Sequence, residues 1–461
     1  MSWPVVLVGM LPEHLLLAGI VLLLIREVSA GASRAALCIS LAAVYAATAA
    51  ALGLGLEGYT AAPFPGQVSV DPQAFAAKAI ILGLAIPVLL ISRDDFAGRQ
   101  FHILLLSALY GACLMVSADT FLTLFIGIEL LSLPVYVLVL LAFRRPESAE
   151  AALKYLVLGG AASATLLMGA SLLYGATGTL ALSAFAQALS SPNAMATTGA
   201  LLVLVAFFLK AAVAPFHAWA PDAYEAASVP VTAFMATIVK AAVILAAARL
   251  FAHAPLAAPM VLLIAVLPLA SIVWGNLAAM RQPGLRRMIA YSSIAHAGYL
   301  FYAFLGDSAT RFEAIAFYVL AYGAMNVLAF AALPPNADDA AHDRLDNLKG
   351  LYHRRPWAAV ALAIAMLSLA GLPPFPGFIA KFLIFKSVIA AGHTLYAVLG
   401  LVGSYLGIYF YLRVVQYLFM SAEETGASRG TSGALAIGAG AICLAAGVVI
   451  AVLPGWVLGL L

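Results

Sequence analysis

The sequence predicts an all-α protein that crosses a membrane many times. Of its 461 residues, 65% are hydrophobic and only 9% are charged, and the mean hydropathy is +1.06. Soluble proteins average about 25% charged residues, so this composition excludes a soluble globular domain. The apolar runs are about 20 residues long, which is the length that a helix needs to cross the hydrocarbon core. Cys38, Cys113 and Cys443 lie far apart in these runs and predict neither a disulfide framework nor a metal site.

The apolar runs of spanning length predict about fourteen transmembrane helices. They are expected at residues 8–25, 35–54, 73–92, 101–117, 119–142, 150–174, 197–228, 230–251, 256–279, 284–305, 310–333, 356–391, 395–419 and 434–453. The first run lacks a basic segment before it, so we interpret it as a retained span rather than a cleaved signal.

The basic residues predict the orientation of these helices. Most of them lie beside loops that follow odd-numbered helices, and only Arg249 and Arg311 border loops after even-numbered ones. The first group is Arg26, Arg34, Arg93, Arg99, Arg144, Arg145, Arg281, Arg286, Arg287, Arg344, Lys349, Arg354, Arg355 and Arg429. By the positive-inside rule the odd loops are cytoplasmic. In a bacterial inner membrane, both termini would then lie on the periplasmic side.

Two of the predicted helices are too long for one straight crossing and have prolines in the middle. Pro215 and Pro221 interrupt the run 197–228, and the stretch Gly371-Leu-Pro-Pro-Phe-Pro-Gly377 interrupts the run 356–391. A proline clashes with the carbonyl four residues earlier, so the first helix is expected to break near Pro215. Inside a bilayer, such a break is tolerated only where protein or a water-filled cavity surrounds it.

The two breaks also indicate an internal repeat. The stretch from Tyr155 to Ser163, before the first break, resembles the stretch from Tyr318 to Asn326, before the second. We interpret helices four to eight and nine to thirteen as two five-helix repeats, which are inverted in the membrane because each has an odd number of spans. The predicted domains are residues 1–100 (three helices), 101–251 (first repeat), 256–419 (second repeat) and 430–461 (the last helix).

Lysine and arginine are distributed differently. Only Lys349 of the seven lysines lies in a loop, whereas the other six fall within predicted helices: Lys78, Lys154, Lys210, Lys240, Lys381 and Lys386. A desolvated ammonium can release its proton and a guanidinium effectively cannot, so this pattern indicates charges that titrate. Lys210 and Lys240, neither expected near a helix end, flank the first break and predict an ion path. Snorkelling to the surface is our interpretation of Lys386 and an open alternative for Lys78 and Lys154.

Two further titratable residues lie midway along predicted helices. Glu129, in the fifth helix, is costly at that depth unless it is paired or protonated, and is therefore a functional candidate. Its alternative role is a static ion pair with a neighbouring helix. His296, in the tenth helix, is either a proton carrier or a hydrogen-bonded core residue. Asp222 and Glu225 are expected near the cytoplasmic end of the broken helix, with helix capping as the simpler explanation. No glycine-rich phosphate loop follows a strand, so we predict no nucleotide or redox site in this chain.

Three motifs resemble one protein family. They are Pro215-Phe-His-Ala-Trp-Ala-Pro-Asp-Ala-Tyr-Glu225 with Val229-Pro-Val-Thr-Ala-Phe234, then Arg286-Arg-Met-Ile-Ala-Tyr-Ser-Ser-Ile-Ala-His-Ala-Gly-Tyr299, and Gly371-Leu-Pro-Pro-Phe-Pro-Gly-Phe-Ile-Ala-Lys-Phe382. Together they resemble the signatures of antiporter-like subunit N of respiratory NADH-quinone oxidoreductase (complex I), over nearly the whole chain. Sister subunit M has glutamate at the position of Lys381, and subunit L is longer. Where the family usually has Tyr-Glu-Gly-Ala-Pro, this chain has Tyr224-Glu-Ala-Ala-Ser228, a difference that concerns loop geometry.

The resemblance implies roles for the buried residues. Glu129 would pair with Lys210, while Lys154, Lys240 and Lys381 match the family's lysines of the sixth, eighth and twelfth helices. Protons would pass from a cytoplasmic inlet to Lys210, along Lys240 and His296, and out past Lys381, driven by quinone reduction elsewhere in the complex. The chain would then be one subunit of a proton-pumping translocase.

The resemblance also implies partners and leaves two alternatives. Flavin, iron-sulfur clusters and quinone are expected on partner subunits, and no cofactor is expected in this chain. The expected partners are the lipid bilayer, subunit M and the small membrane-arm subunits, and no nucleic acid. The alternatives are a subunit of a multisubunit Na⁺/H⁺ antiporter, which shares the fold and the buried lysines, and a purely structural membrane-arm subunit.

Overall fold

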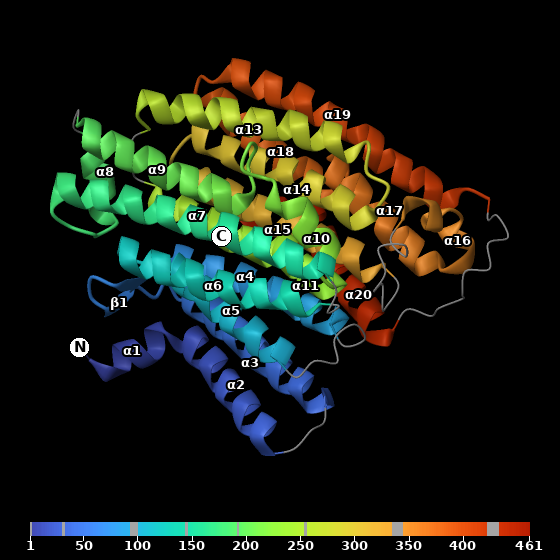
Figure 1. Cartoon of the computed structure of the whole chain (residues 1–461), viewed down its shortest axis with the longest axis horizontal. Helices are drawn as coiled ribbons and strands as arrows, with labels where there is room; N and C mark the ends of the chain where they lie inside the picture. The colour runs from blue at the N-terminus through green and yellow to red at the C-terminus, as the bar shows by residue number, and fades with distance from the viewer. Residues whose placement is uncertain are drawn as a thin grey trace.

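The computed structural model describes residues 2–29, 33–92, 100–142, 146–190, 193–252, 256–333, 344–421 and 433–461. Within these ranges the chain is almost entirely helical, and the long helices lie side by side along the molecule (Figure 1). Eleven of the described helices are long and apolar enough to cross a membrane, or twelve if the bent pair Trp3–Gly9 and Leu11–Val28 is counted as one span. The chain is therefore a polytopic membrane protein.

Each apolar run of the sequence coincides with a helix or with a closely spaced set of helices. In chain order these are α2 (Leu11–Ser29), α3 (Ser33–Leu56), α4 (Pro72–Ile91), α5 (Gln100–Val116), α6 (Phe121–Leu141), α7 (Pro146–Thr177), α9 (Ala194–Ala211) with α10 (Trp219–Ala226), α11 (Val229–Phe234) with the π-helix η1 (Met235–Val239) and α12 (Lys240–Leu250), α13 (Ala258–Ala279), α14 (Leu285–Tyr302) with η2 (Ala303–Leu305), α15 (Arg311–Ala331), α17 (Pro356–Ala370) with α18 (Pro376–Ala390), α19 (Thr394–Phe419) and α20 (Ala434–Val452).

Several short elements lie between these helices and were not expected from the sequence. They are α1 (Trp3–Gly9), α8 (Ser183–Ser190), η3 (Leu345–Leu348), α16 (Leu351–Arg354), α21 (Pro454–Leu458) and the antiparallel strands β1 (Ala61–Phe64) and β2 (Val68–Val70). The all-α prediction is therefore wrong at one hairpin. Its turn contains Gly66 with a φ of +72°, a conformation that glycine adopts readily. Figure 1 places β1 and α8 at one end of the bundle and α16 at the other.

Backbone hydrogen bonds join the hairpin to the neighbouring loops at that end. The amide of Ser69 donates to the carbonyl of Ser117 at 3.0 Å, and the amide of Asp119 donates to Gln67 at 3.0 Å. The next loop is attached in the same way, because the amide of Leu182 donates to the carbonyl of Asp119 at 2.9 Å. The hairpin, the α5–α6 connection and the segment before α8 thus form one connected layer.

Both predicted interruptions are present. Helix α9 ends at Ala211 and α17 ends at Ala370, each four residues before a proline, Pro215 and Pro374. The carbonyl at that distance is the one that a proline ring excludes from a helix, which explains the end of α9. After α17, Pro373 and Pro374 keep the chain from continuing as a helix, and the amides of Gly371 and Leu372 donate to the carbonyls of Ser368 and Leu367. The residue after α17 is Gly371, with a φ of +82° that favours glycine.

The most buried helices form the centre of the bundle. All of the apolar window of Val229–Leu250 is buried, as is 94% of the windows of α14 and α15, whereas only 28% of the window of α20 is. Helix α4 packs against α3 and α5 and also against η1, α12 and α15. The outer helices expose apolar side chains, which a hydrocarbon surrounding accepts. Of the arginines used to predict orientation, Arg93, Arg99, Arg144, Arg145 and Arg429 lie outside the described residues.

Candidate functional site

Lys210 lies in the last turn of α9, one residue before the helix ends. The expectation that it is far from a helix end is wrong, because the break begins at once after Ala211. Its side chain is only 7% exposed. The ammonium lies 3.4 Å from Oε1 of Glu129, 3.3 Å from the hydroxyl of Ser132 and 3.4 Å from that of Tyr136, all on α6. The predicted pair of Glu129 and Lys210 is therefore present.

A third helix contacts two of these partners, Glu129 and Tyr136. The hydroxyl of Ser163, on α7, donates a short hydrogen bond to Glu129, whose side chain is 24% exposed. One turn earlier, Gly159 packs against Tyr136, and a Cβ at that position would lie 1.9 Å from the tyrosine oxygen. Only glycine therefore permits this close approach of α6 and α7 with Tyr136 directed at the ammonium.

Lys240 is buried at the centre of the bundle, immediately after the π-helical turn η1. Its ammonium donates to the backbone carbonyl and the hydroxyl of Ser293 on α14. The same hydroxyl lies 3.3 Å from that of Tyr224, and the ring of Tyr322 lies 5.9 Å from the ammonium. π-Helical turns in long helices occur frequently at functional sites because they shift the register of the side chains.

His296 is buried between two tyrosines. Its Nδ1 lies 2.8 Å from the hydroxyl of Tyr318, and its Nε2 lies 3.1 Å from that of Tyr411, which also bonds to the hydroxyl of Ser292. A hydroxyl both donates and accepts, so either ring nitrogen can carry the proton in this arrangement. A cavity of about 10 Å³ lies between His296 and the second break, bordered by Gly377. That volume is close to the minimum for one water molecule.

Lys381 is the sixth residue of α18, the helix that follows the second break, and it is buried. Its ammonium donates to the carbonyl of Ala370 at 2.9 Å and to the hydroxyl of Ser404 at 3.0 Å. It also lies 4.9 Å from the centre of the Tyr299 ring. A Cβ on Gly371 would come within 2.8 Å of the lysine Cδ, so the glycine leaves room for this side chain. The break thus supplies the free carbonyl that binds the ammonium.

A mostly apolar cavity of about 560 Å³ opens beside Lys381 and Ser404. Lys386 borders the same cavity and is exposed, which agrees with its interpretation as a snorkelling residue. The cavity connects a buried lysine with the surface of the described chain.

Lys154 occupies a different environment from the buried lysines. Its side chain is 44% exposed and its ammonium lies 2.7 Å from both Glu150 and Asp222. Arg287, on α14, pairs with Asp222 at 2.9 Å and with Glu225 at 2.7 Å. In this structure Lys154 is therefore a surface lysine, the alternative that the sequence left open. Asp222 and Glu225 join α10 to α7 and α14 rather than serving only as caps.

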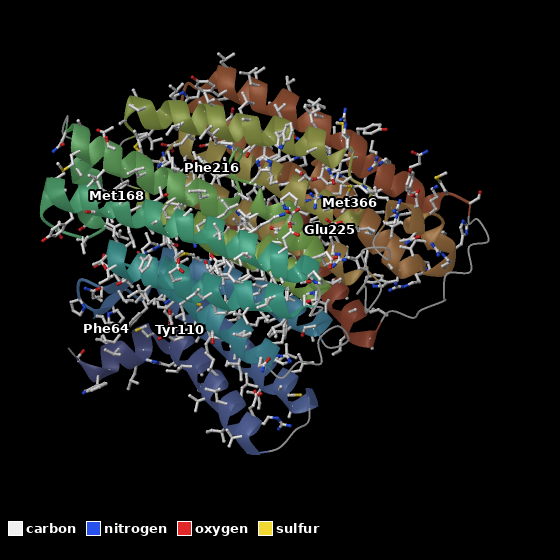
Figure 2. The ribbon with its side chains drawn as sticks, viewed as in Figure 1. Phe64, Tyr110, Met168, Phe216, Glu225 and Met366 are labelled. Atoms are coloured by element: carbon white, nitrogen blue, oxygen red, sulfur yellow. The ribbon has the colours of Figure 1, made fainter. Side chains whose placement is uncertain are left out.

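These ion pairs border a polar cavity of about 350 Å³, lined in part by Glu147 and Glu150. Figure 2 shows Phe216, in the interruption, partway along the bundle, and Glu225 further toward the end that carries α16. The cavity therefore opens on the α16 side of the first break.

Serine and tyrosine hydroxyls are the part of the site that sequence analysis missed. Those that bind the predicted residues come from helices far apart in the chain: Ser132, Tyr136, Ser163, Ser293, Tyr318, Ser404 and Tyr411. Tyr224 contacts one of these hydroxyls, that of Ser293. Their occurrence in otherwise apolar helices was an available signal, but their partners depend on tertiary packing. Within the described residues, no group of three metal-binding side chains comes together.

Comparison with known proteins gives the family. Residues 118–407 match the sequence model of the family described as NADH:quinone oxidoreductase/Mrp antiporter, transmembrane. NADH-quinone oxidoreductase subunit N of Pelobacter propionicus is 40% identical over 419 residues, which cover 91% of this chain and 90% of that protein.

Solved structures agree with this comparison. A chain of respiratory complex I from Thermus thermophilus with bound aureothin is 35% identical, with a TM-score of 0.84 over 97% of this chain and 98% of that one. A chain of the Mrp complex from Dietzia sp. DQ12-45-1b has a TM-score of 0.85 over 100% of this chain and 96% of that one, at 22% identity, which is a likeness of fold alone. From its sequence relatives and its fold, the chain belongs to the family of NADH-quinone oxidoreductase subunit N.

Proposed function

We propose that this chain translocates protons across a bacterial inner membrane as subunit N of NADH-quinone oxidoreductase. Membership of the family supports its place in that complex beside subunit M and the small membrane-arm subunits. Quinone reduction on partner subunits, which carry the flavin and iron-sulfur clusters, would supply the energy. The chain itself would contribute the proton path and no redox group.

One observation carries the proposal: two lysines are buried in the bundle with only uncharged oxygens bound to them. Among the described residues, Lys240 and Lys381 each have hydroxyl and carbonyl acceptors but no carboxylate within ion-pair distance. A permanently charged residue at such depth would be expected to have a counter-ion. Neutral acceptors can bind both the ammonium and the amine, so these sites suit a group that gains and loses a proton.

The same geometry suggests an order for the transfer. Protons would enter through the polar cavity beside Lys154, reach the pair of Glu129 and Lys210, and continue to Lys240 and His296. They would leave past Lys381 through the cavity of about 560 Å³. Among the described residues no hydrogen bond joins Lys210 to Lys240 or Lys240 to His296, so each of those steps needs a water molecule or a side-chain movement.

Orientation and repeats are part of the proposal. We place all fourteen apolar runs in the membrane, with both termini on the periplasmic side and two inverted five-helix repeats. Two features support the repeats. In each interruption a helix ends within four residues of a proline, and a lysine with a largely buried side chain lies beside it.

Substitution of Lys240 tests the path. Lys240→Met removes the titrating group, and Lys240→Arg keeps a charge that cannot be released, so both variants should lose most proton transfer. The purified complex, reconstituted in vesicles with an internal pH dye, reports pumping during NADH oxidation. Lys349→Met is the matched control, because this loop lysine pairs with Asp346 at 3.2 Å outside the bundle centre. Normal pumping by the arginine variant would remove Lys240 from the path.

Two outcomes separate the proposal from its alternatives. Pumping that survives neutralisation of both Lys240 and Lys381 would support a purely structural subunit. Copurification without iron-sulfur and flavin subunits, together with Na⁺-dependent proton exchange in vesicles, would support a multisubunit antiporter.

A further inference from the structure

A second buried pair of titratable side chains lies outside the proposed path. Lys78, on α4, and Glu13, in the first turn of α2, are both 0% exposed, and the ammonium lies 2.6 Å from Oε1 of Glu13. The open alternative that Lys78 snorkels to the surface is therefore wrong. Helices α1 to α3 lie at the edge of the bundle, away from α18 and α19 (Figure 1). The pair thus joins α2 to α4, the first and third of the predicted spans, which precede the predicted repeats.

The pair is poorly supported by hydrogen bonds. Among the described residues, neither carboxylate oxygen of Glu13 nor the ammonium of Lys78 has a hydrogen-bond partner of good geometry, and the two groups have only each other. The ring of Phe75 lies 5.2 Å from the ammonium. A buried ion pair is favourable only if further hydrogen bonds satisfy its remaining lone pairs and protons. These two groups lack that support.

The neighbouring titratable groups offer no replacement for it. On α2, His14 is half-buried and its buried Nε2 has no partner among the described residues. On α5, Tyr110 and Cys113 lie within electrostatic range of Glu13. Figure 2 shows Tyr110 where α5 approaches α1 and α2. Tyr45, on α3, is 69% exposed. The groups that interact with the carboxyl of Glu13 are therefore one ammonium, a phenol and a thiol.

A second ion pair on the same helix provides a contrast. Asp71 caps the start of α4, and its two carboxylate oxygens accept from Arg249 of α12 at 2.6 and 3.0 Å. Burial alone would raise the pKa of Asp71, but the hydrogen bonds and charge of Arg249 outweigh that effect and lower it. Asp71 is 38% exposed and both of its oxygens accept from Arg249, so it stays ionised at neutral pH, whereas Glu13 is fully buried and has a single ammonium beside it.

We propose that the pair of Glu13 and Lys78 is a proton-binding site that exchanges one proton with the aqueous phase at the end of the bundle where the β-hairpin lies. In the empty state the carboxylate of Glu13 lies against the ammonium of Lys78, and the pair carries no net charge. Uptake of one proton from water gives a carboxylic acid beside an ammonium. No other bond forms or breaks, and release returns the proton to water.

The location of the pair gives this site an access route and a link to the path. Glu13 is the third residue of α2 and follows Gly9 by four residues, and Gly9 packs against Pro63 of the hairpin, so Glu13 lies near that end of the bundle. On its other side, α4 packs against η1 and α12, the segment that carries Lys240. A change of charge at Lys78 therefore acts on a helix that contacts the centre of the bundle.

Infrared difference spectroscopy on the intact complex tests the proposal independently of pumping. A pH step across the neutral range should produce a carboxylic-acid C=O band in the wild type, and deuterium exchange should shift it. Glu13→Gln should remove the band, and Glu13→Asp should move it. Asp71→Asn should leave it unchanged, because that carboxylate does not titrate in this range. A band that is identical in the Glu13→Gln complex would overturn the proposal.

Assembly is controlled by a paired variant. The double substitution of Glu13→Leu with Lys78→Met replaces the pair by apolar side chains of similar size, and replacement of a buried ion pair in this way is often tolerated. If Glu13→Gln alone fails to assemble, the double variant supplies the complex for the measurement. Persistence of the C=O band in that complex would show that Glu13 binds no exchangeable proton.

Discussion

Replacing Glu129 by glutamine should sharply reduce pumping while the complex still assembles. The substitution keeps the size of the side chain and its hydrogen-bonding capacity toward Ser163, but it removes the charge 3.4 Å from the ammonium of Lys210. The fold at this position therefore remains supported. What is lost is the dependence of the lysine charge on the position of a carboxylate.

The magnitude follows from the distance. Two unit charges 3.4 Å apart attract by about 5 kcal/mol at an effective dielectric constant near 20 and by about 1 kcal/mol in bulk water. Glu129 is 24% exposed, so the value lies between these limits. Each step of about 1.4 kcal/mol is a factor of ten in an equilibrium constant. The carboxylate therefore shifts the protonation equilibrium of Lys210 by roughly one to three orders of magnitude. That range exceeds thermal energy, so a small displacement can act as a switch.

The assay is NADH-driven proton uptake in vesicles, with assembly verified on native gels. Asp346→Asn is the matched control, since it removes a carboxylate 3.2 Å from a lysine at a site where the carboxylate is 59% exposed and the lysine 32%. A Glu129→Gln complex that pumps at the wild-type ratio of protons to electrons would refute the switch. The static ion pair between α6 and α9 would then be the remaining explanation for both residues.

Three further outcomes are expected. Lys381→Ala should lower coupled pumping several-fold without loss of assembly, whereas Lys386→Ala on the same helix should have little effect; a missing membrane arm on native gels would instead indicate a structural role. Gly159→Ala should lower thermal stability by about 1–3 kcal/mol and reduce pumping, because the new methyl group displaces the tyrosine hydroxyl that contacts the ammonium. The control Gly160→Ala, which meets nothing within 4 Å, should be neutral in both a thermal-shift and a pumping assay. Folding lowers the pKa of Asp71, so its ion pair stabilises the protein above about pH 4. This contribution is lost as the pH falls through the folded-state pKa. Asp71→Asn should therefore reduce the dependence of the free energy of unfolding on pH in that range.

The sequence predicts the large-scale architecture well because hydrophobic length and proline positions are local signals. The end of α9 at Ala211 follows directly from Pro215, and every apolar run became a helix. The environments of the lysines were less accessible. Lys78 and Lys154 look alike in sequence, yet one is fully buried against Glu13 and the other is 44% exposed. That difference depends on which helix packs over each residue, and a single sequence does not contain it.

The π-helical turn before Lys240 and the short hairpin were also missed, for a different reason. The residues of η1 are ordinary helix and strand formers, and the turn arises from packing at the centre of the bundle rather than from composition. Strands β1 and β2 have four and three residues, too few for an alternating pattern to stand out. Sequence patterns therefore identify the long helices and leave such local changes of backbone to the structure.

The connected layer at the hairpin end has a mechanical consequence. Amide-to-carbonyl bonds tie the turn between β1 and β2 to the α5–α6 connection, and tie that connection to the segment before α8. Helices joined in this way cannot slide past one another at that end without breaking several bonds together. The helices are held together at that end, and they can bend mainly where a helix is interrupted. The two proline interruptions are the places where this bending is possible, so a conformational change during turnover would be concentrated beside Lys210 and Lys381.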